Sequence, residues 1–341
     1  MDTGLLDSVP AERRETARAT LAAAFASSAL DALQPIGGGA SGALTYRVEA
    51  SGRSYLLRIE TRRSPLRNPH QYECMRIAAE AGIAPALRYV DADAGVAVMD
   101  FVRQRPIAEY PGGGSALAKD LGRLAARLQR TPAFPSLWDF PRVVERIFGF
   151  VRGSRLFADG LLDSHAEAFE RVRAAYRWDA SALVSSHNDP NPQNVLFDGE
   201  RLWLVDWETA YRNDPLTDVA ILVESFAQTP ELERALVEAW LGGEPDRALR
   251  ARLTLMRQLT RLYYAGLLLS IAASQPREPP ESDLGAPTPA EFRAAFARGE
   301  HAPTSRETMF VLGKMSLASF LAGMSAPGFD EALAIAREGA H

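Results

Sequence analysis

The sequence predicts an α+β protein with two lobes, a small β-rich lobe over residues 1–102 and a larger, mostly helical lobe over residues 103–341. Short strand-like runs dominate the first hundred residues, whereas apolar residues at helical spacing dominate the remainder. The chain has 341 residues, 47% of them hydrophobic, so it can bury a large core, and its length favours two lobes.

The first lobe is expected to begin with a helix over Pro10–Ala32, where Ala, Leu and Phe recur at helical spacing. Three strands are predicted next, Leu33–Ile36, Leu44–Glu49 and Tyr55–Ile59, with a turn at Ser51–Gly52. A glycine-rich segment links the first two strands and would let backbone amides approach phosphate oxygens. Its candidate phosphate contacts are Gly37, Gly38, Gly39, Ser41 and Gly42, and the alternative interpretation is a flexible turn.

A helix over Pro69–Ala81 and a strand over Gly95–Val102 complete the expected small lobe. Helical patterns then fill the larger lobe, at Ser115–Leu128, Pro141–Val151, Leu161–Tyr176, Leu216–Gln228 and Pro230–Leu241. Residues 276–289 are too rich in Pro and polar residues for regular structure and predict a loop or flap before the final helices.

The most informative motif is His187-x-Asp189-x4-Asn194, followed by Asp206 between apolar residues. The pattern is typical of kinases: Asp189 can accept a proton from an attacking hydroxyl, while Asn194 and Asp206 offer hard oxygens to Mg2+ at nucleotide phosphates. Strands over Asn194–Phe197 and Leu202–Val205 are predicted to form a hairpin that brings Asn194 and Asp206 to the same end. The alternative is a polar loop whose Asp and Asn side chains only cap turns.

On these residues the sequence resembles the aminoglycoside phosphotransferase and choline kinase superfamily, over nearly the whole chain. The resemblance implies a two-lobed protein-kinase-like fold, with Asp189 as the catalytic base and His187 as a structural member of the catalytic loop. It also implies that Asn194 and Asp206 bind Mg2+, and that Asp218 braces the loop. Within the superfamily, the chain looks most like the bacterial choline kinase branch.

A kinase needs a cation on its third strand and a carboxylate on the next helix to position that cation. Arg58 and Glu73 are the candidates, and an arginine at this position is usual in the choline kinase branch, as the resemblance implies. The alternative is that they are unrelated surface charges. The adenine ring of ATP is expected against the backbone of Met99, Asp100 and Phe101, at the end of the last small-lobe strand.

Aromatic and acidic residues after Asp206 suggest a pocket for a quaternary ammonium, because ring faces and carboxylates both stabilise a cation. The candidates for acceptor contacts are Glu208, Tyr211, Glu224, Tyr263 and Tyr264, and the alternative is that the aromatic residues belong to the core. Choline kinases commonly carry a tyrosine where this chain has Thr209.

The expected activity is ATP- and Mg2+-dependent phosphorylation of a hydroxyl on a small molecule, with a choline- or ethanolamine-like amino alcohol favoured. The alternatives are an aminoglycoside-type kinase, a kinase for thiamine, homoserine or a sugar, and a catalytically silent nucleotide-binding regulator. A net charge of −5 gives no reason to expect nucleic acid. One cysteine, no visible signal peptide and an apolar run of about twelve residues against the ~20 of a membrane span predict a cytoplasmic protein without a membrane partner. The oligomeric state is left open.

Overall fold

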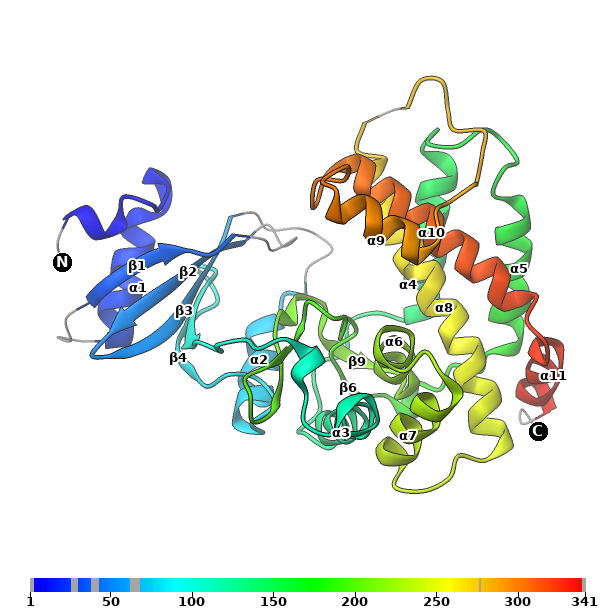
Figure 1. Cartoon of the computed structure of the whole chain (residues 1–341), viewed down its shortest axis with the longest axis horizontal. Helices are drawn as coiled ribbons and strands as arrows, with labels where there is room; N and C mark the ends of the chain where they lie inside the picture. Colours follow the sequence, from blue (N-terminus) through cyan, green and yellow to red (C-terminus); the bar gives the residue numbers. More distant parts are fainter. Residues whose placement is uncertain (1–2, 26–29, 38–42, 62–67, 276, 339–341) are drawn as a thin grey trace. The chain divides into compact units, whose positions relative to one another are not determined.

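The computed structural model of the chain describes residues 3–25, 30–37, 43–61, 68–275 and 277–338 (Figure 1). It separates into two compact units. Unit 1 comprises Met1–Ser136, Val184–Arg212 and Ser225–Gly242, and unit 2 comprises Leu137–Leu183, Asn213–Glu224 and Gly243–His341. Because unit 1 draws on three separate stretches, its limits differ from those of the predicted lobes, and the boundary at residue 102 stays a prediction.

Unit 1 contains a five-stranded antiparallel sheet with the strand order β1-β2-β3-β5-β4. Its strands are β1 (Leu30–Pro35), β2 (Ala43–Ala50), β3 (Arg53–Glu60), β4 (Leu87–Asp91) and β5 (Val96–Asp100). The turn predicted between β2 and β3 is confirmed. Ser51 and Gly52 both have positive φ, 51° and 72°, as a tight two-residue hairpin requires.

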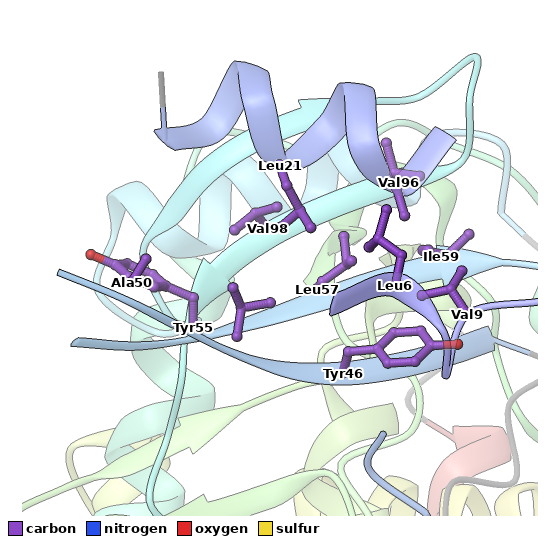
Figure 2. Close-up of a cluster of buried hydrophobic side chains, with 12 residues drawn as sticks. Leu6, Val9, Leu21, Tyr46, Ala50, Tyr55, Leu57, Ile59, Val96 and Val98 are labelled. Atoms are coloured by element: carbon purple, nitrogen blue, oxygen red, sulfur yellow. The ribbon is translucent and has the colours of Figure 1, made fainter. Parts of the chain in front are cut away.

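One face of this sheet is covered by α1 (Arg14–Phe25) and by the short 3-10 segments η1 (Thr3–Leu6) and η2 (Ala11–Arg13). Figure 2 shows the resulting cluster, in which Leu21 of α1 lies over Val98, and Leu6 and Val9 lie over β2 and β3. Tyr46, Leu57 and Ile59 supply the sheet side of the cluster, each 2% exposed or less. Burial of these apolar side chains holds the first helix on the sheet.

The predicted helix over Pro10–Ala32 is too long, because Leu30 pairs with Ala50 as the first residue of β1. Tertiary strand pairing therefore overrides a helical spacing pattern at this point. Strand β4 was not predicted, because it is a half-exposed edge strand without the apolar run that marks a buried strand. The strand predicted over Leu33–Ile36 begins three residues earlier, at Leu30, and the other predicted strands of the sheet are confirmed within two residues at each end.

The rest of unit 1 contains α2 (Gln71–Glu80), α3 (Gly113–Gln129) and α7 (Pro230–Leu241), with the two-stranded pairs β6 (Val184–Ser186) with β9 (Tyr211–Asn213) and β7 (Val195–Phe197) with β8 (Leu202–Leu204). Short 3-10 segments are η3 (Ile107–Glu109) and η5 (Trp207–Thr209). Helices α3 and α7 pack closely at Gly122, where an added Cβ would lie 2.2 Å from the Leu236 carbonyl oxygen. Only glycine permits that approach.

Unit 2 is helical, with α8 (Arg247–Ala272) packed against α4 (Phe140–Gly153), α5 (Asp163–Ala175), α10 (Arg306–Met324) and α11 (Phe329–Glu338). The remaining elements are η4 (Ala180–Ala182), α6 (Leu216–Phe226) and α9 (Pro289–Ala297). The predicted loop before α9 is confirmed for residues 277–288, which have no regular structure apart from one bridge of Glu281 to Phe157. The prediction of an α+β protein with a small sheet and a mostly helical remainder is confirmed.

In the described part of the chain, no single helix has both the length and the apolar character to span a membrane. The bent pair α10 and α11, which meet at 74°, reaches the required length and composition only when counted together.

Candidate functional site

The hairpin of β7 and β8 forms the frame of the candidate site in unit 1. Val195 pairs with Leu204 and Phe197 with Leu202, and the Val205 N–H donates to the Asn194 carbonyl oxygen at 3.0 Å. This hydrogen bond joins Asn194, which directly precedes β7, to Val205, which directly follows β8. The predicted hairpin is therefore confirmed, and it brings the backbone of Asn194 close to that of Asp206.

Asp189 lies in the loop between β6 and this hairpin, and two side-chain amides orient its carboxylate. Asn191 Nδ2 donates to Asp189 Oδ1 at 2.9 Å, and Asn194 Nδ2 donates to Asp189 Oδ2 at 3.1 Å and to its backbone oxygen at 2.9 Å. Each carboxylate oxygen thus has a side-chain amide donor that fixes its orientation. The half-buried carboxylate is able to accept a proton from a nearby hydroxyl.

His187 is fully buried, and its Nε2 donates to the Val205 carbonyl oxygen at 2.9 Å. Burial lowers the pKa of His187 to about 4, partly offset by that hydrogen bond, so the imidazole is neutral near pH 7. Its ring also contacts that of Trp207, with centroids 4.6 Å apart. A neutral, buried imidazole that is hydrogen-bonded to the hairpin backbone is compatible with the structural role in the catalytic loop that the resemblance implies.

Asn188 and Thr209 tie the catalytic loop to the segment after Asp206. Asn188, at a positive φ of 64°, donates from its side chain to the Thr209 carbonyl oxygen at 2.9 Å. Thr209 Oγ1 donates back to the His187 carbonyl oxygen at 3.1 Å. The residue that departs from the choline kinase pattern thus has a local role in joining two parts of the site.

Asp206 has a strained backbone and an under-satisfied carboxylate. Its φ is 64°, in the left-handed region that is uncommon for residues other than glycine, although Asp and Asn adopt it more often than most. Among the described residues, no donor hydrogen-bonds to its buried Oδ1, although Arg58 Nη2 lies 3.5 Å away. A buried carboxylate oxygen in this state is stabilised by a cation.

The side chains of Asn194 and Asp206 fit a magnesium ion. Because Asn194 uses its amide nitrogen toward Asp189, its carbonyl oxygen is left for a hard cation. In the described ranges, no three His, Cys, Asp or Glu side chains gather as a metal cluster. Mg2+ does not require one, since it keeps several waters and binds through one or two carboxylates together with substrate phosphates.

Arg58 points to this site from β3 and is only 5% exposed. Its Nη1 lies 3.3 Å from Glu60 Oε1 and 3.4 Å from Gln71 Oε1, whereas its Nη2 lies 3.3 Å from Glu208 Oε2. The expected partner Glu73 is not among these contacts. Its half-exposed side chain lies 3.9 Å from His70, because Glu73 shares the exposed face of α2 with Arg76 and Glu80.

The predicted nucleotide contacts are only partly described. Gly37 is described, and apart from its chain neighbours no other described residue lies within 4 Å of a Cβ added to it, whereas Gly38, Gly39, Ser41 and Gly42 lie outside the described residues. At the end of β5, the Asp100 N–H donates to the Ala86 carbonyl oxygen at 2.9 Å and the Phe101 N–H to that of Ser54 at 3.2 Å. These two amides are used within unit 1, and the expected adenine contacts at Met99, Asp100 and Phe101 stay predictions.

Some of the residues predicted to contact the acceptor have a carboxylate that is already paired or an aromatic ring that is buried. Glu208 contacts Arg58, and Tyr211 is only 4% exposed. In unit 2, Glu224 lies 2.5 Å from Arg257 and 2.9 Å from Arg261. These two guanidinium groups stabilise its charge, which contradicts its prediction as a cation-binding carboxylate. Tyr263 and Tyr264 are half-buried, with ring centroids 5.6 Å apart.

Three residues in the site were missed from the sequence: Asn191, Glu60 and Gln71. Glu60 could have been found, because residues two apart on a strand lie on the same face, and it follows Arg58 by two. Asn191 could have been found only as a polar neighbour in the loop. Asp218 is buried in the first turn of α6, and its bracing role stays a prediction.

Comparison with known proteins agrees with this fold and site. The sequence model of the phosphotransferase enzyme family matches residues 32–253, more than half of the chain. The chain therefore belongs to the phosphotransferase enzyme family, which confirms the predicted class of enzyme.

Solved structures show the kinase-like fold. A choline/ethanolamine kinase family protein from Mesorhizobium loti is 22% identical with a TM-score of 0.65, over 95% of this chain and 99% of that one. Choline kinase LicA from Streptococcus pneumoniae is 13% identical with a TM-score of 0.57, over 91% of this chain and 100% of that one. Spectinomycin phosphotransferase in complex with ADP and its antibiotic is 13% identical with a TM-score of 0.51, over 84% and 94%. The prediction of a two-lobed protein-kinase-like fold is confirmed.

Curated relatives match over short stretches. Protein LicA from Haemophilus influenzae is 39% identical over 58 residues, which are 17% of this chain and 22% of LicA. An uncharacterized protein from Metamycoplasma hominis is 44% identical over 67 residues, 19% of this chain and 13% of that protein. The chain thus matches about a fifth or less of the length of these relatives.

Proposed function

We propose that this chain is an ATP- and Mg2+-dependent kinase that phosphorylates a hydroxyl group of a small molecule. The observation that carries the proposal is the constellation in unit 1, where Asp189, Asn194 and Asp206 meet around one hairpin and Arg58 lies 3.5 Å from Asp206. A general base, two hard oxygen ligands and a buried cation are the components that phosphoryl transfer requires.

In the proposed reaction, Asp189 accepts the acceptor's hydroxyl proton as the oxygen forms a bond to the γ-phosphorus of ATP. The bond from that phosphorus to the β,γ-bridging oxygen breaks, and ADP leaves. Asn194 and Asp206 would hold Mg2+, which neutralises phosphate charge when bound. Arg58, with its planar guanidinium, contacts phosphate oxygens on the same side of the site.

The nucleotide part of the proposal has two supports. A glycine-rich segment lies between two antiparallel strands, since β1 ends at Pro35 and β2 begins at Ala43. In addition, the spectinomycin phosphotransferase that shares this fold is described with ADP. Backbone amides in a glycine-rich link are suited to phosphate oxygens.

For the acceptor, we propose a small amino alcohol such as choline or ethanolamine. Two of the structural neighbours are a choline/ethanolamine kinase family protein and a choline kinase, and a curated relative is LicA. Glu208 of unit 1 remains a candidate contact, whereas Tyr263 and Tyr264 lie in unit 2 and stay predictions. Glu224 is withdrawn because Arg257 and Arg261 pair with its carboxylate. An aminoglycoside is the second candidate acceptor, supported by the spectinomycin phosphotransferase neighbour.

The test is nucleotide consumption by the purified chain with Mg2+ and a panel of acceptors, with each product identified by its mass. The panel includes choline, ethanolamine, thiamine, homoserine, simple sugars and aminoglycosides. We expect the mass of choline or ethanolamine to increase by about 80 Da, which corresponds to the addition of one phosphoryl group. If an aminoglycoside is the only acceptor that is phosphorylated, the proposal of an amino alcohol as acceptor is wrong. Absence of turnover and of ATP binding would contradict the kinase itself and favour another role.

A further inference from the structure

Arg58 and Glu60 occupy the same buried face of β3. Alternate residues of a strand point to the same side, so the two side chains are neighbours by geometry. Arg58 is 5% exposed and Glu60 is 7% exposed. A buried guanidinium is stable only when its charge is paired and its N–H groups are satisfied, so the identity of its neighbours determines its position.

Arg58, Gln71 and Tyr72, all described residues, meet at Glu60 Oε1. Arg58 Nη1 lies 3.3 Å from it, Tyr72 OH donates to it at 2.9 Å, and Gln71 Nε2 also donates to it. Tyr72 and Gln71 begin α2, so Glu60 joins the strand that carries Arg58 to the following helix. Burial raises the pKa of the Tyr72 phenol, and the Glu60 charge adds to this effect, so Tyr72 remains a donor.

The two ends of the Arg58 guanidinium have different partners. Nη1 is held by Glu60 and Gln71, whereas Nη2 is directed to Asp206 at 3.5 Å and Glu208 at 3.3 Å. Because a guanidinium is planar and rigid, fixing one end sets the direction of the other. Glu60 therefore controls which way Nη2 points, and Nη2 points to the proposed phosphate and metal site.

We propose that Glu60, on the same strand as Arg58, is the positioning residue that aims Arg58 at the nucleotide phosphates. This inference rests on the proposed function, in which Arg58 contacts ATP. Glu73, the carboxylate that the sequence suggests for this task, lies on the exposed side of α2 and contacts His70. Glu73 therefore provides a matched control of the same residue type in the adjacent helix.

The experiment measures ATP affinity by titration, together with KM for ATP and kcat, in the variants Glu60→Gln, Glu73→Gln, Arg58→Ala and the double variant Arg58→Ala/Glu60→Gln. We expect Glu60→Gln to raise KM for ATP about tenfold with a smaller change in kcat, because a charge-assisted hydrogen bond is lost. Glu73→Gln should change KM less than about twofold, as expected for a surface charge. The double variant should match Arg58→Ala, since Glu60 acts through Arg58.

A purely structural role of Glu60 would add its full effect to that of Arg58→Ala, and this result would overturn the inference. The inference would also be overturned if Arg58→Ala raises KM for ATP while Glu60→Gln leaves it unchanged. Equal effects of Glu60→Gln and Glu73→Gln on KM would overturn it as well. Thermal unfolding is followed in each variant. If Glu60→Gln does not fold, Glu60→Asp, which retains the charge, should fold with an intermediate KM, and a normal KM would reject the role. If Arg58→Ala binds ATP as wild type does, the proposed function of Arg58 itself fails, and this inference fails with it.

Discussion

The side-chain amide of Asn191 donates a hydrogen bond to Asp189 Oδ1 at 2.9 Å. Asn191 in turn is held by the Gln193 backbone N–H, which donates to its Oδ1 at 2.8 Å. The loop thus supplies a fixed donor for one oxygen of the proposed base. Asn194 supplies the donor for the other oxygen, so the carboxylate plane is set from both sides.

Replacement of Asn191 tests this orientation. We expect Asn191→Ala to lower kcat by about 10- to 100-fold with little change in KM for ATP, because a misdirected base costs rate rather than binding. Steady-state kinetics at saturating acceptor provide the measurement. Gln193→Ala, an exposed neighbour in the same loop, is the control and should retain its rate.

Replacement of Asp189 tests the base. Asp189→Asn should lower turnover by about 10^2- to 10^4-fold while ATP affinity changes little, because the amide cannot accept the hydroxyl proton. Turnover and ATP titration in the same preparation separate the two effects. Turnover near the wild-type value would remove Asp189 from the mechanism.

Replacement of Asp206 tests the metal ligand. We expect Asp206→Ala to weaken the Mg2+ dependence of nucleotide binding by at least about tenfold, more than Asp189→Asn does, because it removes a charged ligand. Mg2+ titration of ATP binding is the measurement. Asp198→Ala serves as the control: Asp198 accepts from Trp203 Nε1 at 2.7 Å in the hairpin turn and has no proposed part in metal binding. Equal Mg2+ dependence in Asp206→Ala and wild type would exclude this assignment.

The buried His187 predicts a loss of stability in mild acid. Its pKa is lowered from 6.5 to about 4 in the folded chain, so the unfolded chain takes up a proton more readily. The contribution of His187 to the free energy of unfolding is fully present above pH 6.5 and is lost as the pH falls toward 4. The total loss is about 3 kcal/mol. Burial lowers the pKa of His165 as well, which acts in the same direction. Urea unfolding between pH 7.5 and 4.5 should show this decrease in the free energy of unfolding, and the decrease should be smaller in His187→Gln.

Two glycines in helices should respond oppositely to alanine. Gly122→Ala would place a Cβ 2.2 Å from the Leu236 carbonyl oxygen and 3.0 Å from the Trp240 nitrogen, so α3 and α7 must separate. We expect a loss of about 1–3 kcal/mol. Gly149 of α4 has no described residue within 4 Å of its added Cβ beyond its own helix, so Gly149→Ala should stabilise by about 0.5–1 kcal/mol. Thermal unfolding of both variants checks the pair, and equal effects would contradict the close contact of α3 with α7.

Local sequence alone determined the centre of the candidate site. Asn194 and Asp206 are joined by a hairpin of two three-residue strands, and such a hairpin forms from neighbouring residues with its register set by the turn. His187 and Asp189 precede it directly. Because these relationships span fewer than about twenty residues, spacing and residue type were sufficient to predict them.

Only the tertiary structure decided which charges meet. Glu73 and Glu224 have the right residue type near the right elements, yet the phase of α2 directs Glu73 to solvent, and Arg257 and Arg261 of α8 pair with Glu224. Glu60 reaches Arg58, Gln71 and Tyr72 through the packing of β3 against α2. The partner of a charged side chain depends on contacts between elements distant in the chain, and these contacts are absent from local periodicity. The sequence therefore determined the chemistry of the catalytic loop, whereas packing between elements determined how the surrounding charges are paired.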